Sequence, residues 1–117
     1  MLMVNAQTLP VRLTRRHEFL RLAARGKKVA KYGLVLQLDQ GEPGDSVRVG
    51  YTATKKIGNA VARNRAKRRL REAARLVLAD RPMPGAALVL IARRETGDMD
   101  FARLRHNLSK ALDEAVS

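Results

Sequence analysis

The segment KKIGNAVARNRAKRRLREAAR, from Lys55 to Arg75, has nine Lys or Arg side chains in twenty-one residues and a single acidic side chain, Glu72. Arg outnumbers Lys, and the planar guanidinium group binds phosphate oxygens through two parallel hydrogen bonds. A helix face that is merely solvated usually interleaves Glu four residues from Lys or Arg, because such pairs stabilise the helix slightly. The near absence of Glu therefore favours the binding of phosphate groups over a simple solvated surface.

A helical arrangement sorts the side chains between positions 61 and 78 onto two faces. One face is a narrow stripe, mostly alanine, made of Ala62, Ala66, Leu70, Ala73 and Val77. The opposite face is basic and is made of Asn64, Lys67, Arg68, Arg71 and Arg75, with Arg63, Arg65 and Arg69 at its flanks. The spacing predicts a helix from about Asn59 to Ala79 that packs closely on a sheet and presents its basic face to solvent.

The composition of the whole chain points to the same kind of partner. Its 117 residues include 24 Lys or Arg and 11 Asp or Glu, which gives a net charge of +13. A charge of this size destabilises the folded chain by self-repulsion unless a polyanion offsets it, so nucleic acid is the first partner to consider. An anionic membrane surface is the second, but the narrow stripe and the lack of a long apolar segment disfavour it.

The acidic residues do not suggest a nuclease site within this chain. Metal-dependent hydrolysis of a phosphodiester needs clustered carboxylates that hold one or two divalent ions. Here the acids are scattered, mostly in turns and near helix ends, and His17 and His106 fall on different predicted helices. Asp98 and Asp100 are better explained as candidates for the N-cap of the last helix. We therefore expect no catalytic residue and no metal site in this chain.

The ends of the chain and the absence of cysteine bear on its compartment. Without Cys the chain can form neither a disulfide nor a thiolate metal site. The charged residues near the N-terminus follow the apolar ones, whereas a secretory signal has the reverse order. We therefore expect a cytoplasmic protein.

Hydrophobic periodicity predicts a single α+β domain over residues 1–117, with a small sheet and helices packed on it. The expected elements are an extended arm over 1–13, a helix from Thr14 to Gly26, a strand over 33–40, a turn over 41–45, a strand over 46–54, the basic helix, a buried strand over 86–93 and a helix from about Asp100. A short strand near 29–32 is a further element. The strands on either side of the 41–45 turn are expected to pair as an antiparallel hairpin.

The type of nucleic acid follows from what the chain lacks. It has no zinc module and no purely helical domain that would read a DNA major groove. Its four aromatic residues do not form the stacking strands of an RRM. The remaining interpretation is a helix that follows the phosphates of folded RNA. A ribosomal protein or assembly factor stays open at this point, as does a DNA-compacting protein.

The basic segment also resembles a known signature. Lys55-Lys56-x-Gly58-x-Ala60-Val61-x-Arg63-Asn64-Arg65, followed by Lys67, Arg68, Arg71 and Glu72, is similar to the "RNR" motif of the bacterial ribonuclease P protein component. The similarity extends over the chain and includes Arg12, Leu13, Glu18, Phe19, Gly26 and the pair Ala92-Arg93. It is this signature, with its Gly58 and Asn64 positions, that separates the chain from a structural RNA-binding protein of similar composition.

The resemblance implies the protein subunit of a ribozyme, and thus of an endoribonuclease whose chemistry lies in RNA. The RNA subunit, with bound Mg²⁺, removes the 5′ leader from precursor tRNA. The protein assists by binding the catalytic RNA and the single-stranded leader, and we expect it to be monomeric within the holoenzyme. The implied fold is an α/β sandwich with a central, mostly antiparallel sheet and a left-handed βαβ crossover, which is an exception to the usual hand.

The resemblance also assigns site residues. The residues that match the RNA-docking positions are Lys55, Lys56, Arg63, Asn64, Arg65, Arg68 and Arg69. The residues that match leader-contacting positions are Phe19, Thr52, Lys67 and Arg71. Relatives often carry further aromatic residues where this chain has Ala23 and Gln37, so we expect the leader to be held more by charge than by stacking. A role for Phe19 in the core stays open.

Overall fold

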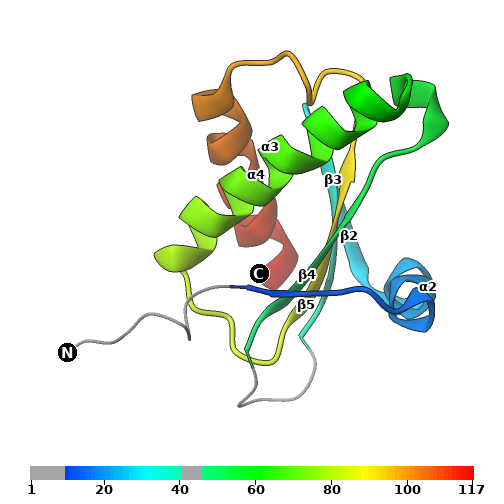
Figure 1. The fold of residues 1–117 in the computed structure, drawn as a ribbon. Coiled ribbons are helices and arrows are strands. Elements are labelled where there is room, and N and C mark those ends of the chain that lie inside the picture. Colours follow the sequence, from blue (N-terminus) through cyan, green and yellow to red (C-terminus); the bar gives the residue numbers. More distant parts are fainter. Residues whose placement is uncertain (1–9, 41–45) are drawn as a thin grey trace.

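The computed structural model describes residues 10–40 and 46–117 of the chain. Its sheet has five strands, in the order β1-β4-β5-β3-β2 (Figure 1). The strands are β1 (Val11–Arg12), β2 (Lys27–Lys31), β3 (Leu34–Asp39), β4 (Arg48–Thr52) and β5 (Ala87–Ala92). The helices are α2 (Arg16–Arg25), the 3₁₀ turn η1 (Lys55–Ile57), α3 (Ala60–Ala79) and α4 (Phe101–Val116). The α+β class predicted from periodicity is confirmed.

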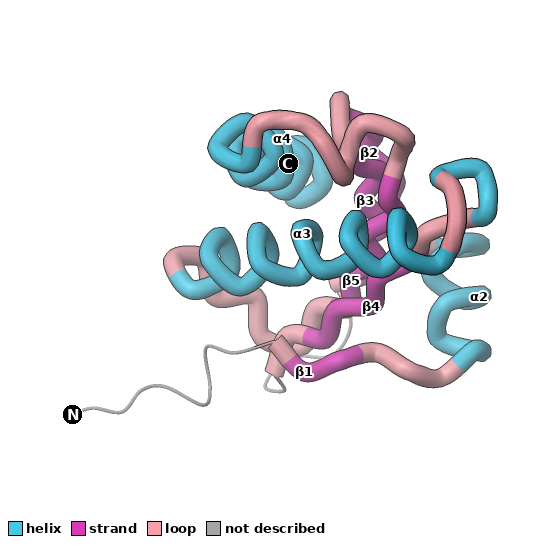
Figure 2. Tube along the Cα trace, turned by 45° about the horizontal axis from the view of Figure 1, so that its top comes forward, coloured by secondary structure: helices cyan, strands magenta, loops and turns pink. Residues whose placement is uncertain are grey.

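The sheet separates two layers of helices, as Figure 2 shows with the sheet nearly edge-on. The helices α3 and α4 lie on one side, and α2 lies on the other. Because side chains alternate along a strand, Leu88 and Leu90 of β5 join the core under α3 and α4, whereas Val89 joins a smaller cluster under α2. The two sides of the sheet therefore carry separate surfaces.

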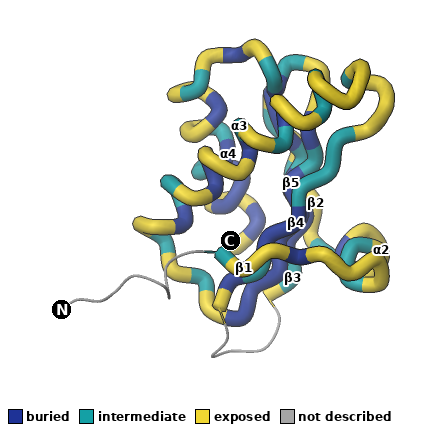
Figure 3. The backbone as a smooth tube through the Cα atoms, in the orientation of Figure 1, coloured by how far each residue is buried: buried dark blue, intermediate teal, exposed yellow. Residues whose placement is uncertain are grey.

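The predicted hairpin is wrong, because β5 lies between β3 and β4. It pairs antiparallel with β3 and parallel with β4, so the sheet is mixed rather than mostly antiparallel. The physical reason is visible in Figure 3, where the central strands are buried. Five of the six residues of β5 are buried, so this strand needs neighbours on both edges and cover on both faces. A hairpin of β3 with β4 would have left it at an edge.

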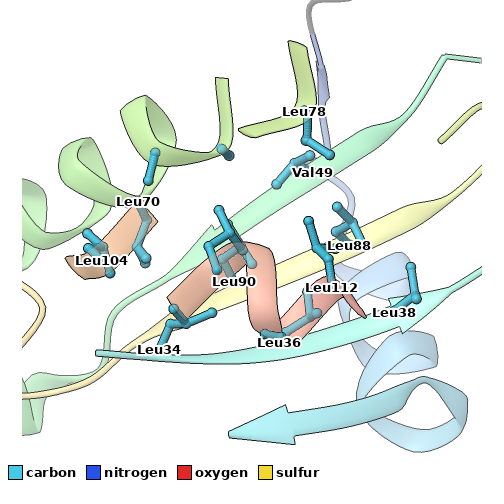
Figure 4. Packing of buried hydrophobic residues seen from close by; sticks show 14 of the residues in the cluster. Leu34, Leu36, Leu38, Val49, Leu70, Leu78, Leu88, Leu90, Leu104 and Leu112 are labelled. Carbon is cyan, nitrogen blue, oxygen red and sulfur yellow. The ribbon is translucent and has the colours of Figure 1, made fainter. Parts of the chain in front are cut away.

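The parallel neighbours β4 and β5 are joined through α3, which makes the βαβ unit that the resemblance implies. The left hand of this crossover stays a prediction. The core beneath α3 is built from leucine and valine, with Leu70 and Leu78 of α3 above Val49 and Leu90 of the strands (Figure 4). Burial of this stripe holds the helix in place despite the repulsion along its outer face.

The ends of the helices agree with the sequence at two positions and differ at a third. Asn59, the predicted start of α3, caps this helix by accepting a hydrogen bond from the Ala62 amide. Asp100, one of the two predicted cap candidates, caps α4 by accepting one from the Arg103 amide. The helix α2, however, is preceded by Arg15 rather than Thr14. Gly26 ends α2 as expected, although its φ of −72° is ordinary. Glycine is required there because a Cβ would lie 2.6 Å from the carbonyl oxygen of Leu22.

The described part of the predicted arm belongs to the sheet. Val11 and Arg12 pair parallel with β4, and Leu13 is buried. The predicted extra strand near 29–32 is confirmed as β2, which pairs with β3. Residues 1–9 of the arm and the predicted turn at 41–45 lie outside the described residues.

Candidate nucleic-acid interface

The entrance to α3 is fixed by a tight turn that carries two cations. Lys55 and Lys56 lie exposed on η1, and Gly58 follows with a φ of +143°, a conformation that favours glycine. Asn59 then caps the helix. The turn at Gly58 and the cap at Asn59 fix the backbone of both lysines relative to the first turn of α3. The segment can therefore present its hydrogen-bond donors to a ligand without a loss of backbone entropy on binding.

The buried face of α3 is close to the predicted stripe but is rotated slightly. Ala66, Leu70 and Ala73 are buried as predicted, and Ala74 and Leu78 are buried with them. The other two predicted members, Ala62 and Val77, are half-buried. The small side chains let the helix approach the sheet and α4 closely, so its basic side chains extend from the opposite side.

The predicted RNA-docking residues lie together along the outer side of η1 and α3. Asn64, Arg65 and Arg68 are exposed, and Arg63 is half-buried. Among the described residues, the one ion pair of this group joins Arg65 to Asp98, whose carboxylate is 3.9 Å away and 88% exposed. An ion pair this long and this exposed to water contributes little to stability. Within the described chain, the positive charge of the predicted docking residues is therefore left almost uncompensated.

Arg69 is the exception among the predicted docking residues. Its guanidinium donates to the carbonyl oxygen of Thr96 at 2.9 Å and to that of Met99 at 2.6 Å, and it lies 5.8 Å from the ring of Phe101. Thr96 is itself fully buried and donates to the carbonyl oxygen of Gly33. Arg69 thus ties α3 to the loop before α4, a role that the sequence pattern did not indicate.

We expect Arg69→Ala to lower the free energy of unfolding by about 2 kcal/mol, because two charge-assisted hydrogen bonds are lost and two carbonyl groups lose a partner. Urea denaturation followed by circular dichroism measures this. Arg68→Ala is the matched control, since Arg68 is exposed on the same helix and should change stability by less than about 0.5 kcal/mol. Equal stability of the two variants would contradict a structural role for Arg69.

The predicted leader-contacting residues divide between the two sides of the sheet. Phe19 lies on α2, half-buried against a cluster that includes Leu13, Leu22 and Val89. A Cβ on Gly50 would come within 2.5 Å of its ring, so the ring packs directly on the backbone of β4. Thr52 alternates with Tyr51 along β4 and therefore faces the same side as Phe19. These two residues share one surface.

An ion pair fixes the helix that carries Phe19. Glu18 pairs with Arg48 of β4, on the side of the sheet that α2 covers.

The positions where relatives often carry aromatic residues differ in their surroundings: Ala23 is exposed on α2, and Gln37 is 7% exposed in the sheet. Phe19 is therefore the one aromatic ring that the described chain places between α2 and the sheet.

The other two predicted leader residues, Lys67 and Arg71, lie one turn apart on α3. Arg71 is exposed, and its guanidinium lies 5.5 Å from the ring of Tyr51. Tyr51 belongs to the core cluster on the α3 side of the sheet. The structure thus places Phe19 and Thr52 on one side of β4 and Lys67 and Arg71 on the other, rather than in one continuous pocket.

No pattern in the sequence indicates the surroundings that the structure gives to Tyr51. A hollow of about 250 Å³ lies between β1 and α3, and we call it the β1–α3 hollow. Its lining consists of Pro10, Val11, Val49, Tyr51 and three arginines, Arg12, Arg71 and Arg75. Burial raises the pKa of Tyr51 to about 12, although the charges of Arg71 and Arg12 oppose the rise. The phenol therefore stays protonated at neutral pH. No sequence signal could have joined β1 to α3, since the parallel pairing of β1 with β4 creates the hollow.

No three His, Asp or Glu side chains within 10–40 and 46–117 lie close enough together to hold a metal ion. Over the same residues, no helix is both long and apolar enough to cross a bilayer.

Comparisons with known proteins agree on one family. The family described as Ribonuclease P matches residues 9–116. The ribonuclease P protein component of Gluconacetobacter diazotrophicus is 50% identical over 104 residues, which cover 89% of this chain and 90% of that protein. The component of Caulobacter vibrioides is 51% identical over 102 residues, covering 86% and 68%.

Solved structures agree with the sequence relatives. The RNase P protein of Staphylococcus aureus superposes with a TM-score of 0.74 at 29% identity, over 89% of this chain and 94% of that one. The RNase P protein of Thermotoga maritima gives a TM-score of 0.72 at 30% identity with the same coverage. The chain therefore belongs to the ribonuclease P family as its protein component, a subunit of the ribonucleoprotein endoribonuclease that processes tRNA.

Proposed function

We propose that this chain docks on the catalytic RNA of ribonuclease P through the outer side of η1 and α3 and holds the single-stranded 5′ leader of precursor tRNA. The observation that supports the proposal is the row of exposed cations beside Asn64, whose one ion pair among the described residues is the long, exposed contact between Arg65 and Asp98. The docking residues are Lys55, Lys56, Arg63, Asn64, Arg65 and Arg68. We assign Arg69 to the same surface, where its hydrogen bonds to the loop before α4 position its neighbours.

The physical basis is the release of counterions from RNA. Each phosphate neutralised by Lys or Arg frees condensed cations, which favours binding and makes it depend steeply on salt. The cap and the packing fix the backbone of α3, so the helix offers several guanidinium groups to phosphates from one side. The RNA thus offsets the repulsion that the net charge of +13 creates.

The leader is proposed to contact the chain on both sides of β4. Phe19 supplies a ring on the α2 side, Thr52 a hydroxyl on the same side, and Lys67 and Arg71 supply charge on α3. The Mg²⁺ ions that activate water in the cleavage reaction are proposed to be held by the RNA subunit, and this chain binds no cofactor of its own. We further propose that the chain acts as a monomer within the holoenzyme and in the cytoplasm.

We expect Arg68→Ala to weaken binding to the catalytic RNA and to reduce the slope of log K against log salt by about 0.7–0.9, because one phosphate contact is lost. Filter binding over a range of KCl concentrations measures the slope. Arg105→Ala serves as the control, since Arg105 is an exposed arginine of α4 outside the proposed surface. If the two variants had the same slope as the wild type, Arg68 would not contact a phosphate.

A further inference from the structure

The β1–α3 hollow has an apolar wall and is open to solvent. The wall is formed by Val11, Val49 and the ring of Tyr51, and Val11 is 49% exposed on the two-residue edge strand β1. Figure 2 shows β1 lying alongside β4 below α3. The hollow is lined by side chains from these three elements. At about 250 Å³ the hollow is smaller than the roughly 300–1,000 Å³ typical of sites for drug-sized ligands. A single flat ring system therefore suits it better than a large cofactor.

The rim of the hollow carries uncompensated positive charge. Arg75 is held by Glu72, to which it donates two hydrogen bonds of 2.5 and 3.1 Å. Arg12 and Arg71, in contrast, form no ion pair within the described residues. Both lie close enough to the Tyr51 hydroxyl to act on it through their charges. Two guanidinium groups are thus available to a ligand at the mouth of an apolar hollow.

This combination selects the chemistry of the ligand. Unpaired bases stack on aromatic rings and on guanidinium planes. Guanidinium groups only donate hydrogen bonds, so the ligand must offer acceptors. A nucleotide supplies both a flat ring and an adjacent phosphate. An apolar protein side chain would match only the wall, and free phosphate would match only the rim.

We propose that the β1–α3 hollow binds one unpaired nucleobase of the 5′ leader, stacked against Tyr51 and Arg71, while Arg12 contacts a neighbouring phosphate. The inference rests on the proposed function and adds a specific subsite to it. Arg71 connects the hollow to the leader, because it lies one helical turn from Lys67 on the exposed side of α3. Tyr51 thereby supplies a stacking surface on the side of the sheet opposite Phe19.

The test uses the holoenzyme reconstituted from this chain and a bacterial ribonuclease P RNA, with precursor tRNAs that carry an abasic nucleotide at successive leader positions. Tyr51→Leu keeps an apolar side chain but removes the ring. We expect it to weaken binding of the intact precursor about tenfold, as for one lost base stack, and to leave binding of mature tRNA unchanged. At one leader position, the abasic precursor should bind the wild-type holoenzyme about as weakly as the intact precursor binds the Tyr51→Leu holoenzyme. Combining the two changes should weaken binding no further, because both remove the same contact.

Matched variants separate this subsite from general effects. Tyr51→Phe keeps the ring and should bind nearly as the wild type does. Tyr32→Leu removes an exposed tyrosine that also has an arginine, Arg103, over its ring but lies outside the hollow, and it should have no effect. Val11→Trp fills the hollow from the exposed edge strand and should reproduce the loss, which guards against misfolding of Tyr51→Leu.

Additive losses at every leader position would overturn the subsite, as would full leader binding by both Tyr51→Leu and Val11→Trp. A loss that appears equally with mature tRNA would also overturn it, because the base bound would then not belong to the leader. Failure of the proposed function looks different: the wild-type holoenzyme itself would show no preference for precursors with a leader over mature tRNA.

Discussion

Phe19→Ala is expected to weaken binding of leader-bearing precursor tRNA to the holoenzyme about 5–150-fold while leaving the affinity for mature tRNA unchanged. The range corresponds to the roughly 1–3 kcal/mol that one base stack contributes. The ring is half-buried, packs on Gly50 and is the one aromatic that the described chain places between α2 and the sheet. Equilibrium binding of the two tRNAs at fixed Mg²⁺ and salt gives both affinities.

Phe19 also belongs to a small apolar cluster, so its removal must cost stability as well. Leu22→Ala is the matched control, because Leu22 is on the same helix, in the same cluster and only 2% exposed. This variant should lower the free energy of unfolding by about 2–5 kcal/mol yet retain discrimination between the two tRNAs in the fraction that is folded. If Leu22→Ala and Phe19→Ala lost leader affinity equally, the role of Phe19 would be confined to the core.

The second large effect concerns the repulsion within the free chain. We expect the catalytic RNA to raise the free energy of unfolding by about 2.7 kcal/mol when its concentration is a hundred times Kd, because it binds only the folded chain. The underlying cause is the row of cations on η1 and α3, where the ion pairs among the described residues are Arg65 with Asp98 and Arg75 with Glu72. Urea unfolding followed by circular dichroism, with and without the RNA, measures the change.

The stabilisation of the chain by RNA should depend on where the cations lie on its surface and not only on their number. The combined change Arg63→Ala, Arg65→Ala and Arg68→Ala removes three cations from the proposed docking residues, so the free chain should gain stability and the RNA should add less to it. Replacing Arg94, Arg103 and Arg105 by alanine is the control, since it removes the same charge from exposed positions elsewhere. If both triple variants behaved alike, net charge rather than the docking surface would govern the effect.

The basic helix was predictable because its signals are local. The Ala stripe, the cap at Asn59 and the breakers after Ala79 all act within a few residues, and α3 runs from Ala60 to Ala79 as a result. The same holds for α4, with Asp100 at its start. Local signals failed for the sheet. Two adjacent strands with a short turn satisfy the pattern of a hairpin, and only the need to bury β5 on both faces excludes it.

The site shows the same division between local and long-range information. Charge and spacing identify which residues of α3 face outward, but they do not distinguish Arg68 from Arg69. That distinction depends on the carbonyl groups of Thr96 and Met99, which are brought to α3 by the packing of α4. The sequence indicates only that Tyr51 belongs to a strand, because its neighbours Val11 and Arg71 come from segments far away in the chain. Long-range contacts therefore decide which cations stay free for a ligand and which hold the fold.

The central claim is that this chain assists a catalytic RNA, and reconstitution at low Mg²⁺ tests it most directly. Chain freed of nucleic acid would be mixed with a bacterial ribonuclease P RNA and a precursor tRNA with a labelled leader. We expect release of the leader when both components are present, and little release with either alone. Cleavage by the chain alone would contradict the assignment of the chemistry to RNA, and binding of both RNAs without any gain in cleavage would contradict the claim itself.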